Sequence, residues 1–371
     1  MRSLSFRMTV AVFFASPIVL AAGLAQGQAP QQAPADAPAA AKPKVAIHES
    51  YPNRIQARLE QRTRSLSHVT SPKSGVHPQF VIRLTKLWAT GQTVKIAFRG
   101  GDKVLHQKIA DTVSEWTQYA NLTFDFGLNP ATGQYRTWKR TDTAFAADIR
   151  VSFDQDGYFS LVGNDSVNRS ITKPGEESLN LQGFDQSLPS DWKAVAQHEF
   201  GHAIGFEHEH QGPVAMCDFR FDDDPGYIAT TDSFGQFITD PNGKRPGLYT
   251  LLGGPPNNWP QAVVDFNLKK LPASSAIVAG PFDRFSIMKY FFEADFFGLG
   301  ASSPCFTNTE NLVISAQDKA GAGKVYPRGA SAIAADVSLR EKVLTDITNA
   351  PAMPAALKKH YENSLSALKN R

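Results

Sequence analysis

At 371 residues, of which 42% are hydrophobic, the chain is long enough for one large domain or two ordinary ones around a sizeable core. Its 38 Lys and Arg nearly balance 35 Asp and Glu, which gives a formal net charge of +3. This composition excludes a chain that is disordered throughout, and it shows neither the clustered basic charge of a nucleic-acid-binding protein nor a polybasic membrane surface.

The N-terminus has the pattern of an export signal. Arg2 and Arg7 precede an apolar run over residues 8–24 that ends in small residues, so we expect residues 1–25 to be a cleaved signal peptide. The alternative is a retained anchor, but Pro17 interrupts the run, which is shorter than the roughly 20 residues of a spanning helix. We therefore expect a secreted or periplasmic protein without stable membrane association.

Residues 26–85 precede the predicted folded domain. Residues 26–44 consist almost entirely of Gln, Ala, Pro, Gly and Lys, which cannot bury enough apolar area to form a core. Residues 45–85 are mixed and basic, with Arg54, Arg58, Arg62 and Arg64 close together. The sequence is compatible with a removable pro-segment and with a permanent N-terminal extension.

The folded domain is expected to start near Lys86. Residues 93–98 (TVKIAF) alternate polar and apolar side chains, as a half-buried strand does. Asp102 is placed to cap a helix, and the apolar residues after it follow helical spacing, namely Leu105, Ile109, Val113 and Trp116.

Further strands are predicted before a second helix. They cover residues 122–126 (LTFDF), 148–153 (DIRVSF) and, more briefly, 178–181 (SLNL), and Ser190 and Asp191 offer the start of the helix. Strands on both sides of one helix, followed by another helix, predict an α+β domain with a mixed twisted sheet in its N-terminal half.

The second half of the chain is expected to be irregular. Residues 218–282 are rich in Gly, Pro, Asn and Asp, and the acidic run at 222–224 is expected to be solvated, because it lacks the spacing of a calcium loop. Helical spacing returns after Pro327, so residues 331–371 are expected to form a helical extension that packs on the domain.

The chain contains two cysteines, Cys217 and Cys305. In an oxidising compartment they are expected to form one disulfide, and the alternative is two separate buried thiols. Two distant thiols cannot build a four-thiolate zinc site, so any metal must be held by other side chains.

Four of the nine histidines lie within residues 198–210, HEFGHAIGFEHEH. In a helix, residues four apart lie one above the other, so His198 and His202 can present two imidazole nitrogens to one ion. A straight helix would carry His208 away from this pair. Gly205 can adopt the left-handed conformation that ends a helix and turns the chain back, and His208 can then complete a three-histidine site.

Glu199 follows the first predicted ligand directly. It would project beside the metal rather than onto it, where its carboxylate can accept a proton from a zinc-bound water as general base. The full HExxHxxGxxH pattern behind an export signal therefore predicts one catalytic Zn²⁺ ion, because zinc makes a hydroxide-like nucleophile available near neutral pH and polarises a carbonyl.

This pattern resembles the metzincin zinc peptidases, and Glu209 directly after the third histidine makes it similar to the astacin-like zinc metallopeptidases in particular. A second mark of that family follows at residues 286–290 (SIMKY), which look like its Met-turn. The resemblance implies that Met288 forms an apolar floor under the ligands. It also implies that Tyr290 is a switchable extra ligand that stabilises the developing oxyanion.

The resemblance has further implications. Glu209 is expected to be a buried carboxylate that pairs with the trimmed N-terminus, while a local ion pair with Arg or Lys is the alternative. His210 has no expected metal role. Residues 157–164 and 177–182 resemble the family's edge strand and its neighbour, along which an extended substrate would add as another strand.

Several features depart from the family. Lys289 stands where histidine is common, the stretch between His210 and Met288 is long, and only one disulfide can form. No pro-segment aspartate of the family type that would keep the zinc latent is evident.

Residues 86–330 are thus expected to form a metzincin-like catalytic domain of a secreted zinc endopeptidase that acts on protein or peptide substrates. One alternative is a zinc-binding adhesion or binding protein with a retired protease site, and another is a hydrolase of a different bond. Neither the oligomeric state nor the cleavage specificity can be read from the sequence.

Overall fold

The computed structural model describes residues 47, 49–66, 82–271, 277–278, 280–351 and 353–370. The predicted signal peptide at 1–25 and the linker at 26–44 lie outside the described residues. None of the helices in the described part of the chain combines the length and apolar character needed to cross a bilayer. The description below concerns the compact unit Lys44–Arg371.

The centre of the fold is a mixed five-stranded sheet with strand order β3-β2-β4-β6-β5. All neighbouring pairs are parallel except β5 with β6, so β5 is an antiparallel edge strand. The strands are β2 (Thr93–Phe98), β3 (Thr123–Asp125), β4 (Ile149–Ser152), β5 (Tyr158–Ser160) and β6 (Leu179–Leu181).

Two helices follow the strands as predicted. Helix α2 (Lys103–Val113) begins where the Asp102 carboxylate accepts a hydrogen bond from the backbone N–H of Leu105, and it packs against α4 (Trp192–Ala203). The chain breaks the helix after Val113, so Trp116 begins a separate short helix, α3 (Trp116–Tyr119). The fully buried Trp116 indole still donates to Gln197 O of α4 at 2.8 Å, which fixes α4 on this core.

Residues 53–66 form a helix that the sequence analysis did not anticipate, α1 (Asn53–Leu66). Its Ile55 and Leu59 are buried against an apolar cluster next to β5 that contains Phe159 and Leu161. Three arginines at spacings of four on α1 reach carboxylates of the half that contains the sheet: Arg54 pairs with Glu177, Arg58 with Glu176 and Arg62 with Asp165.

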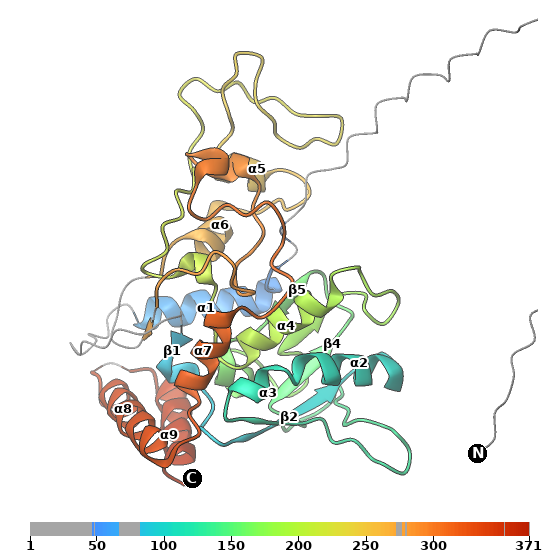
Figure 1. The fold of residues 1–371 in the computed structure, drawn as a ribbon, viewed down its shortest axis with the longest axis vertical. Helices are drawn as coiled ribbons and strands as arrows, with labels where there is room; N and C mark the ends of the chain where they lie inside the picture. The colour runs from blue at the N-terminus through green and yellow to red at the C-terminus, as the bar shows by residue number, and fades with distance from the viewer. Residues whose placement is uncertain are drawn as a thin grey trace, which may run out of the picture. The chain divides into compact units, whose positions relative to one another are not determined.

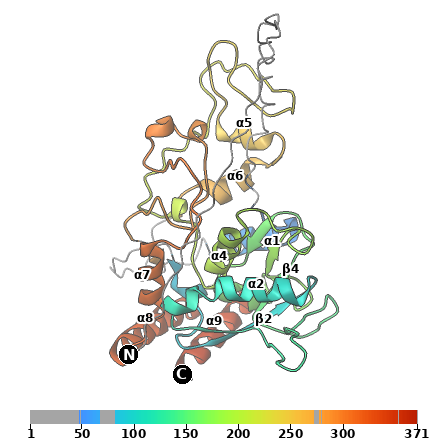
Figure 2. The same ribbon diagram turned by 45° about the vertical axis from the view of Figure 1, so that its right-hand side comes forward.

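The second half is irregular, as expected, and carries short elements. These are the helices α5 (Leu248–Gly253), α6 (Gln261–Leu268) and α7 (Ala316–Val325) and the strand β7 (Ile277–Val278), which pairs with β1 (Ile82–Arg83) from the first half. Cys217 and Cys305 form a disulfide within a second core that includes Phe292, Phe296 and Phe297. Helices α5 and α6 lie together, apart from the sheet, in both views (Figures 1 and 2).

The C-terminal extension is helical. Helices α8 (Ala330–Thr348) and α9 (Ala355–Lys369) lie side by side (Figure 1) and share an apolar cluster with Ala89. Asp336 accepts a hydrogen bond from Thr90, and Arg340 donates to Leu87 O. The extension therefore packs on the segment that leads into β2.

Candidate metal centre

Helix α4 supplies the first two histidines of the centre. His198 and His202 lie one helical turn apart on the face of α4 that is turned toward the loops of the second half. Their Nε2 atoms are 3.1 Å apart. The helix is almost completely buried over its last turns, so the two rings have little freedom to rotate.

The end of α4 is a Schellman turn. Phe206 N–H donates to Gly201 O at 3.0 Å and Gly205 N–H donates to His202 O at 2.8 Å, with Gly205 at φ +108°. This turn reverses the chain and places His208 Nε2 3.0 Å from His202 Nε2. Gly205 thus produces the bend that the motif predicted.

Each of the three imidazoles is oriented by an oxygen acceptor at Nδ1. The distances are 2.6 Å from His198 to Ile287 O, 2.7 Å from His202 to Phe206 O, and 3.0 Å from His208 to Gln211 Oε1. A carbonyl oxygen can only accept, so Nδ1 carries the proton of the neutral ring. The three Nε2 lone pairs therefore converge on one point, as in metal sites whose histidine ligands are held by a second partner.

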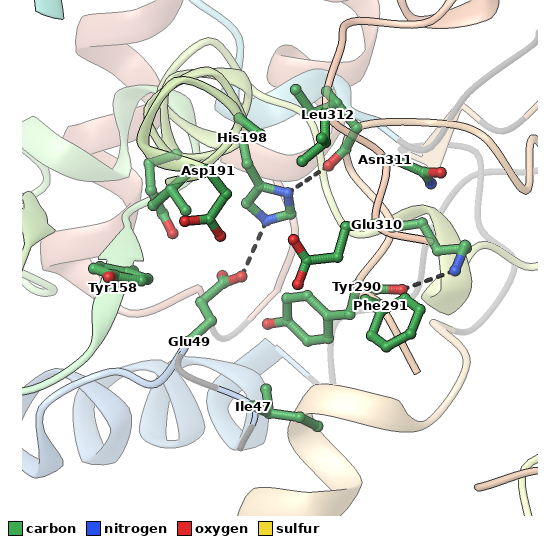
Figure 3. Close-up of a pocket in the computed structure, with 15 residues that line it drawn as sticks. Ile47, Glu49, Tyr158, Asp191, His198, Tyr290, Phe291, Glu310, Asn311 and Leu312 are labelled. Carbon is green, nitrogen blue, oxygen red and sulfur yellow. Dashed lines mark hydrogen bonds and ion pairs between the residues drawn. The ribbon is translucent and has the colours of Figure 1, made fainter. Parts of the chain in front are cut away.

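A fourth ligand atom comes from Glu49, which the sequence analysis missed. One of its carboxylate oxygens lies 3.0 Å from His198 Nε2 (Figure 3). The distances to the other two rings are 3.1 Å to His208 Nε2 and 3.3 Å to His202 Nε2. Burial alone would raise the pKa of Glu49, but positive charge on the three imidazoles, when they are protonated, lowers it well below its ordinary range. The four residues form one group whose ligand atoms all lie within 4.8 Å of one another.

This donor set fits a zinc ion. Tetrahedral nitrogen ligands at 2.0–2.1 Å from zinc are about 3.3 Å from one another, close to the 3.0 and 3.1 Å found between the Nε2 atoms. Three neutral imidazoles and a carboxylate are ligand types that zinc accepts. Without a cation, three lone pairs and a carboxylate at these distances would repel one another.

Residues 49–51 also cover the edge strand. Glu49 forms a parallel bridge with Tyr158, Ser50 N–H donates to Tyr158 O at 3.1 Å, and Tyr51 Oη donates to Ser160 O at 2.8 Å. The segment therefore occupies the edge of β5, which the sequence analysis assigned to an extended substrate.

Glu199 lies beside the convergent nitrogens and is almost completely buried. Its Oε2 has no hydrogen-bond partner among the described residues. Burial raises the pKa of the Glu199 carboxyl well above its ordinary range, and the neighbouring Glu49 charge adds to this. A buried carboxylate oxygen without a partner beside the centre is suited to accept a proton from a water there.

Met288 lies beneath the centre. A Cβ on Gly201 would come within 2.3 Å of Met288 Sδ, so the glycine lets the methionine approach α4 directly. The turn is held from the other side by Asp318, whose carboxylate accepts hydrogen bonds from Ser286 Oγ at 2.6 Å and Ile287 N at 2.9 Å. Asp318 is a second residue that the sequence analysis did not identify.

Tyr290 stands next to the third histidine. Its ring centroid is 4.3 Å from that of His208 and 5.9 Å from that of His198, and in Figure 3 the phenol points toward Glu49. Burial raises the pKa of Tyr290 well above its ordinary range, so the phenol stays protonated and can donate. Lys289 is turned to the protein, where Nζ donates to Tyr290 O at 2.8 Å.

Glu209 is buried behind the centre. Its carboxylate accepts a hydrogen bond from Asp283 N at 2.9 Å, and no Arg or Lys of the described chain forms an ion pair with it. The local ion pair considered as an alternative is therefore not found. Burial raises the pKa of Glu209 to about 8. His210 has no place in the metal group, and its Nε2 faces Asn267 O at 2.9 Å.

The chain was compared with protein families, curated sequences and solved structures. No family model and no curated protein matches it. A structure of myroilysin matches with 27% identity and a TM-score of 0.50, over 67% of this chain and 99% of myroilysin. The hatching-enzyme zinc-protease high choriolytic enzyme 1 of the medaka fish Oryzias latipes is 15% identical, with a TM-score of 0.36 over 69% of this chain and 98% of that one. The α+β fold of the chain is thus metzincin-like, as the sequence resemblance implies, and its three histidines form with Glu49 a group that could hold a metal ion.

Proposed function

We propose that this chain is an exported zinc endopeptidase that hydrolyses internal peptide bonds of extended protein segments. The observation that carries the proposal is the convergence of three Nε2 lone pairs beside a buried, unpartnered Glu199 Oε2. A binding protein with a retired site would be expected to lack a ligand or the base, and here every one of these groups is in position.

His198, His202 and His208 hold the ion in this proposal. Zinc bound there lowers the pKa of a water to about 7 and polarises a carbonyl. Glu199 Oε2 takes a proton from the attacking water and passes it to the leaving amine. The Tyr290 phenol donates a hydrogen bond to the oxyanion of the tetrahedral intermediate, and the free edge of β5 aligns the substrate backbone.

The decisive experiment compares Glu199→Gln with the wild type on casein and on a broad peptide library. Loss of the base should lower the cleavage rate by about 10²- to 10⁴-fold, while zinc content stays near one per chain. Glu341→Gln, the same change on α8 outside the centre, is the control and should cleave like the wild type. Wild-type rates in Glu199→Gln would refute the proposal, and a zinc-loaded wild type that cleaves nothing would favour the binding protein.

The form described here is, in this proposal, the latent one. Glu49 fills the position beside the histidines that water needs, and residues 49–51 cover β5. Removal of this segment opens the edge strand and also removes a charge that raises the pKa of Glu199, so the base ionises more readily. Residues 49–66 therefore act as an inhibitory pro-segment.

Glu49→Gln tests this latency in the intact chain. The amide keeps the size of the side chain but loses the charge, which is worth about 1.5–3 kcal/mol in a charge-assisted hydrogen bond. Peptide cleavage by the uncleaved chain should rise by about 10- to 100-fold. Gln61→Ala, on the exposed side of α1, should leave it unchanged. Equal activity of Glu49→Gln and wild type would show that the carboxylate does not restrain the site.

A further inference from the structure

The cavity beside the metal centre is rich in carboxylates. Besides Glu49 and Glu199, it is lined by Asp191 and Glu310. In Figure 3 these two residues lie on opposite sides of His198, and the Glu310 carboxylate is directed to the space between His198 and Tyr290. Once the Glu49 segment has left, the two carboxylates flank the place where the scissile bond must lie.

The walls between these carboxylates are apolar. Ala194 and Val195 contribute from the first turns of α4, and Ile287 and Leu312 contribute from the loops of the second half. Glu199, whose buried Oε2 has no partner among the described residues, lines the same cavity, so the cavity adjoins the position of the reacting atoms. An apolar channel with an acidic rim suits a long side chain that has a methylene stem and a cationic head.

Asp191 is available for such a head group. It is the last residue before α4, but its carboxylate makes no capping hydrogen bond and has no ion-pair partner among the described residues. Burial raises the pKa of Tyr158 on the edge strand β5, and the charge of Asp191 adds to this, so Asp191 acts electrostatically on the cleft.

One cation, Lys289, lines the described part of this cavity, and it does not neutralise the rim. Its Nζ donates to Tyr290 O at 2.8 Å and lies 5.5 Å from the centre of the Phe292 ring, inside the second core. The described lining of the cavity therefore carries more carboxylates than cations.

We infer that the cleft selects peptide bonds flanked by lysine or arginine, with Asp191 and Glu310 as the residues that determine this specificity. The inference rests on the proposed function, since it assigns a substrate class to the same site. On one side of the scissile bond the stem of a basic side chain packs on Val195 with its head at Asp191, and on the other side it packs on Leu312 with its head at Glu310. An acidic side chain at either position is repelled.

The test uses the secreted protein, whose N-terminus is first determined by mass spectrometry. Peptides that differ only in the residue flanking the cleaved bond, Arg, Leu or Glu, are compared by kcat/KM. The Arg peptide should exceed the Glu peptide by about tenfold or more. With the varied residue on the Asp191 side of the bond, the ratio of Arg to Leu peptide should fall about three- to fivefold in Asp191→Asn. With the varied residue on the Glu310 side, the ratio should fall by about as much in Glu310→Gln, which is the strength of a partly exposed ion pair.

Each variant is judged by the ratio of its kcat/KM values for two peptides. A smaller fraction of folded enzyme lowers both values equally and leaves the ratio unchanged. Asp185→Asn and Glu341→Gln, the same changes outside the cleft, should keep the wild-type ratio. If no peptide is cleaved, the proposed function fails and this inference fails with it. If all peptides are cleaved without a charge preference, or if the preference persists in both cleft variants, the proposed function stands and the inference alone is overturned.

Discussion

At the residue scale, Gly205 decides whether three histidines can meet. Its φ of +108° is strained for any L side chain, and a Cβ would come within 2.6 Å of Leu87 Cδ2. Gly205→Ala should therefore destabilise the protein by about 1–3 kcal/mol and weaken zinc binding, because His208 follows the turn. Urea denaturation and zinc titration measure both effects.

The matched control is Gly243→Ala. This glycine has φ +78°, and nothing lies within 4 Å of a Cβ placed on it, so the substitution introduces backbone strain without a clash and far from the centre. It should lower stability but leave zinc affinity unchanged. Equal zinc affinity in Gly205→Ala and wild type would contradict the role given to this turn.

Glu209 should make stability depend on pH. Its folded-state pKa of about 8 lies above the ordinary value of 4.5, so between these values the folded chain keeps a proton that the unfolded chain has lost. Stability from this group is complete below pH 4.5 and falls as the pH rises to 8, by at most about 5 kcal/mol. Glu209→Gln lacks this titration, so its free energy of unfolding relative to wild type should increase across that window. Parallel curves for the two proteins, measured by urea unfolding at several pH values, would exclude the effect.

The residues of the site differ in how far they can be predicted from sequence. The histidines, Glu199 and Gly205 lie within one helix and its cap, where spacing fixes geometry. Glu49 contacts His198 although the two residues are 149 positions apart in the sequence, and no local sequence pattern predicts such a contact. The same holds for Asp318, which reaches Ser286 from α7 and reads locally as a helix-capping residue.

At the element scale, α1 holds residues 49–66 on the half of the domain that contains the sheet. Ile55 is completely buried against the cluster next to β5, and Ile→Ala in such a position costs about 2–5 kcal/mol. Ile55→Ala should loosen α1, so limited proteolysis within residues 53–66 should become faster and the intact chain should gain peptidase activity. Gln61→Ala on the exposed face is the control. Unchanged cleavage of α1 would show that ion pairs alone hold it.

In the elements that were predicted, apolar residues recur at the regular spacing of a strand or a helix and form one apolar face. Strand β2 and helix α2 follow the alternation and the stripe that the sequence displays. Helix α1 was not predicted because part of its packing face is charged: Arg54, Arg58 and Arg62 turn toward carboxylates of the half that contains the sheet rather than to solvent. Pairing of this kind requires the partner segments, which are over 100 positions away.

At the scale of the whole molecule, the metal centre joins three parts of the chain. Helix α4 brings two ligands, the loop after Gly205 brings the third, and the segment before α1 brings Glu49. The second core, with its disulfide and Tyr290, closes the site from the other side. An ion at this junction binds only the folded arrangement, so its binding free energy adds to the stability of the entire unit.

Removal of the metal should therefore lower the melting temperature of the whole unit rather than loosen one loop. With zinc at about 1,000 times its dissociation constant, the linked stabilisation is about 4 kcal/mol, and phenanthroline should abolish it reversibly. His208→Ala should melt near the temperature of the chelated wild type and should not respond to zinc, whereas Glu199→Gln keeps all the ligands and should respond fully. Calorimetry with and without chelator distinguishes these outcomes. If neither zinc nor chelator changes the melting temperature of the wild type, the three histidines do not hold an ion that stabilises the fold.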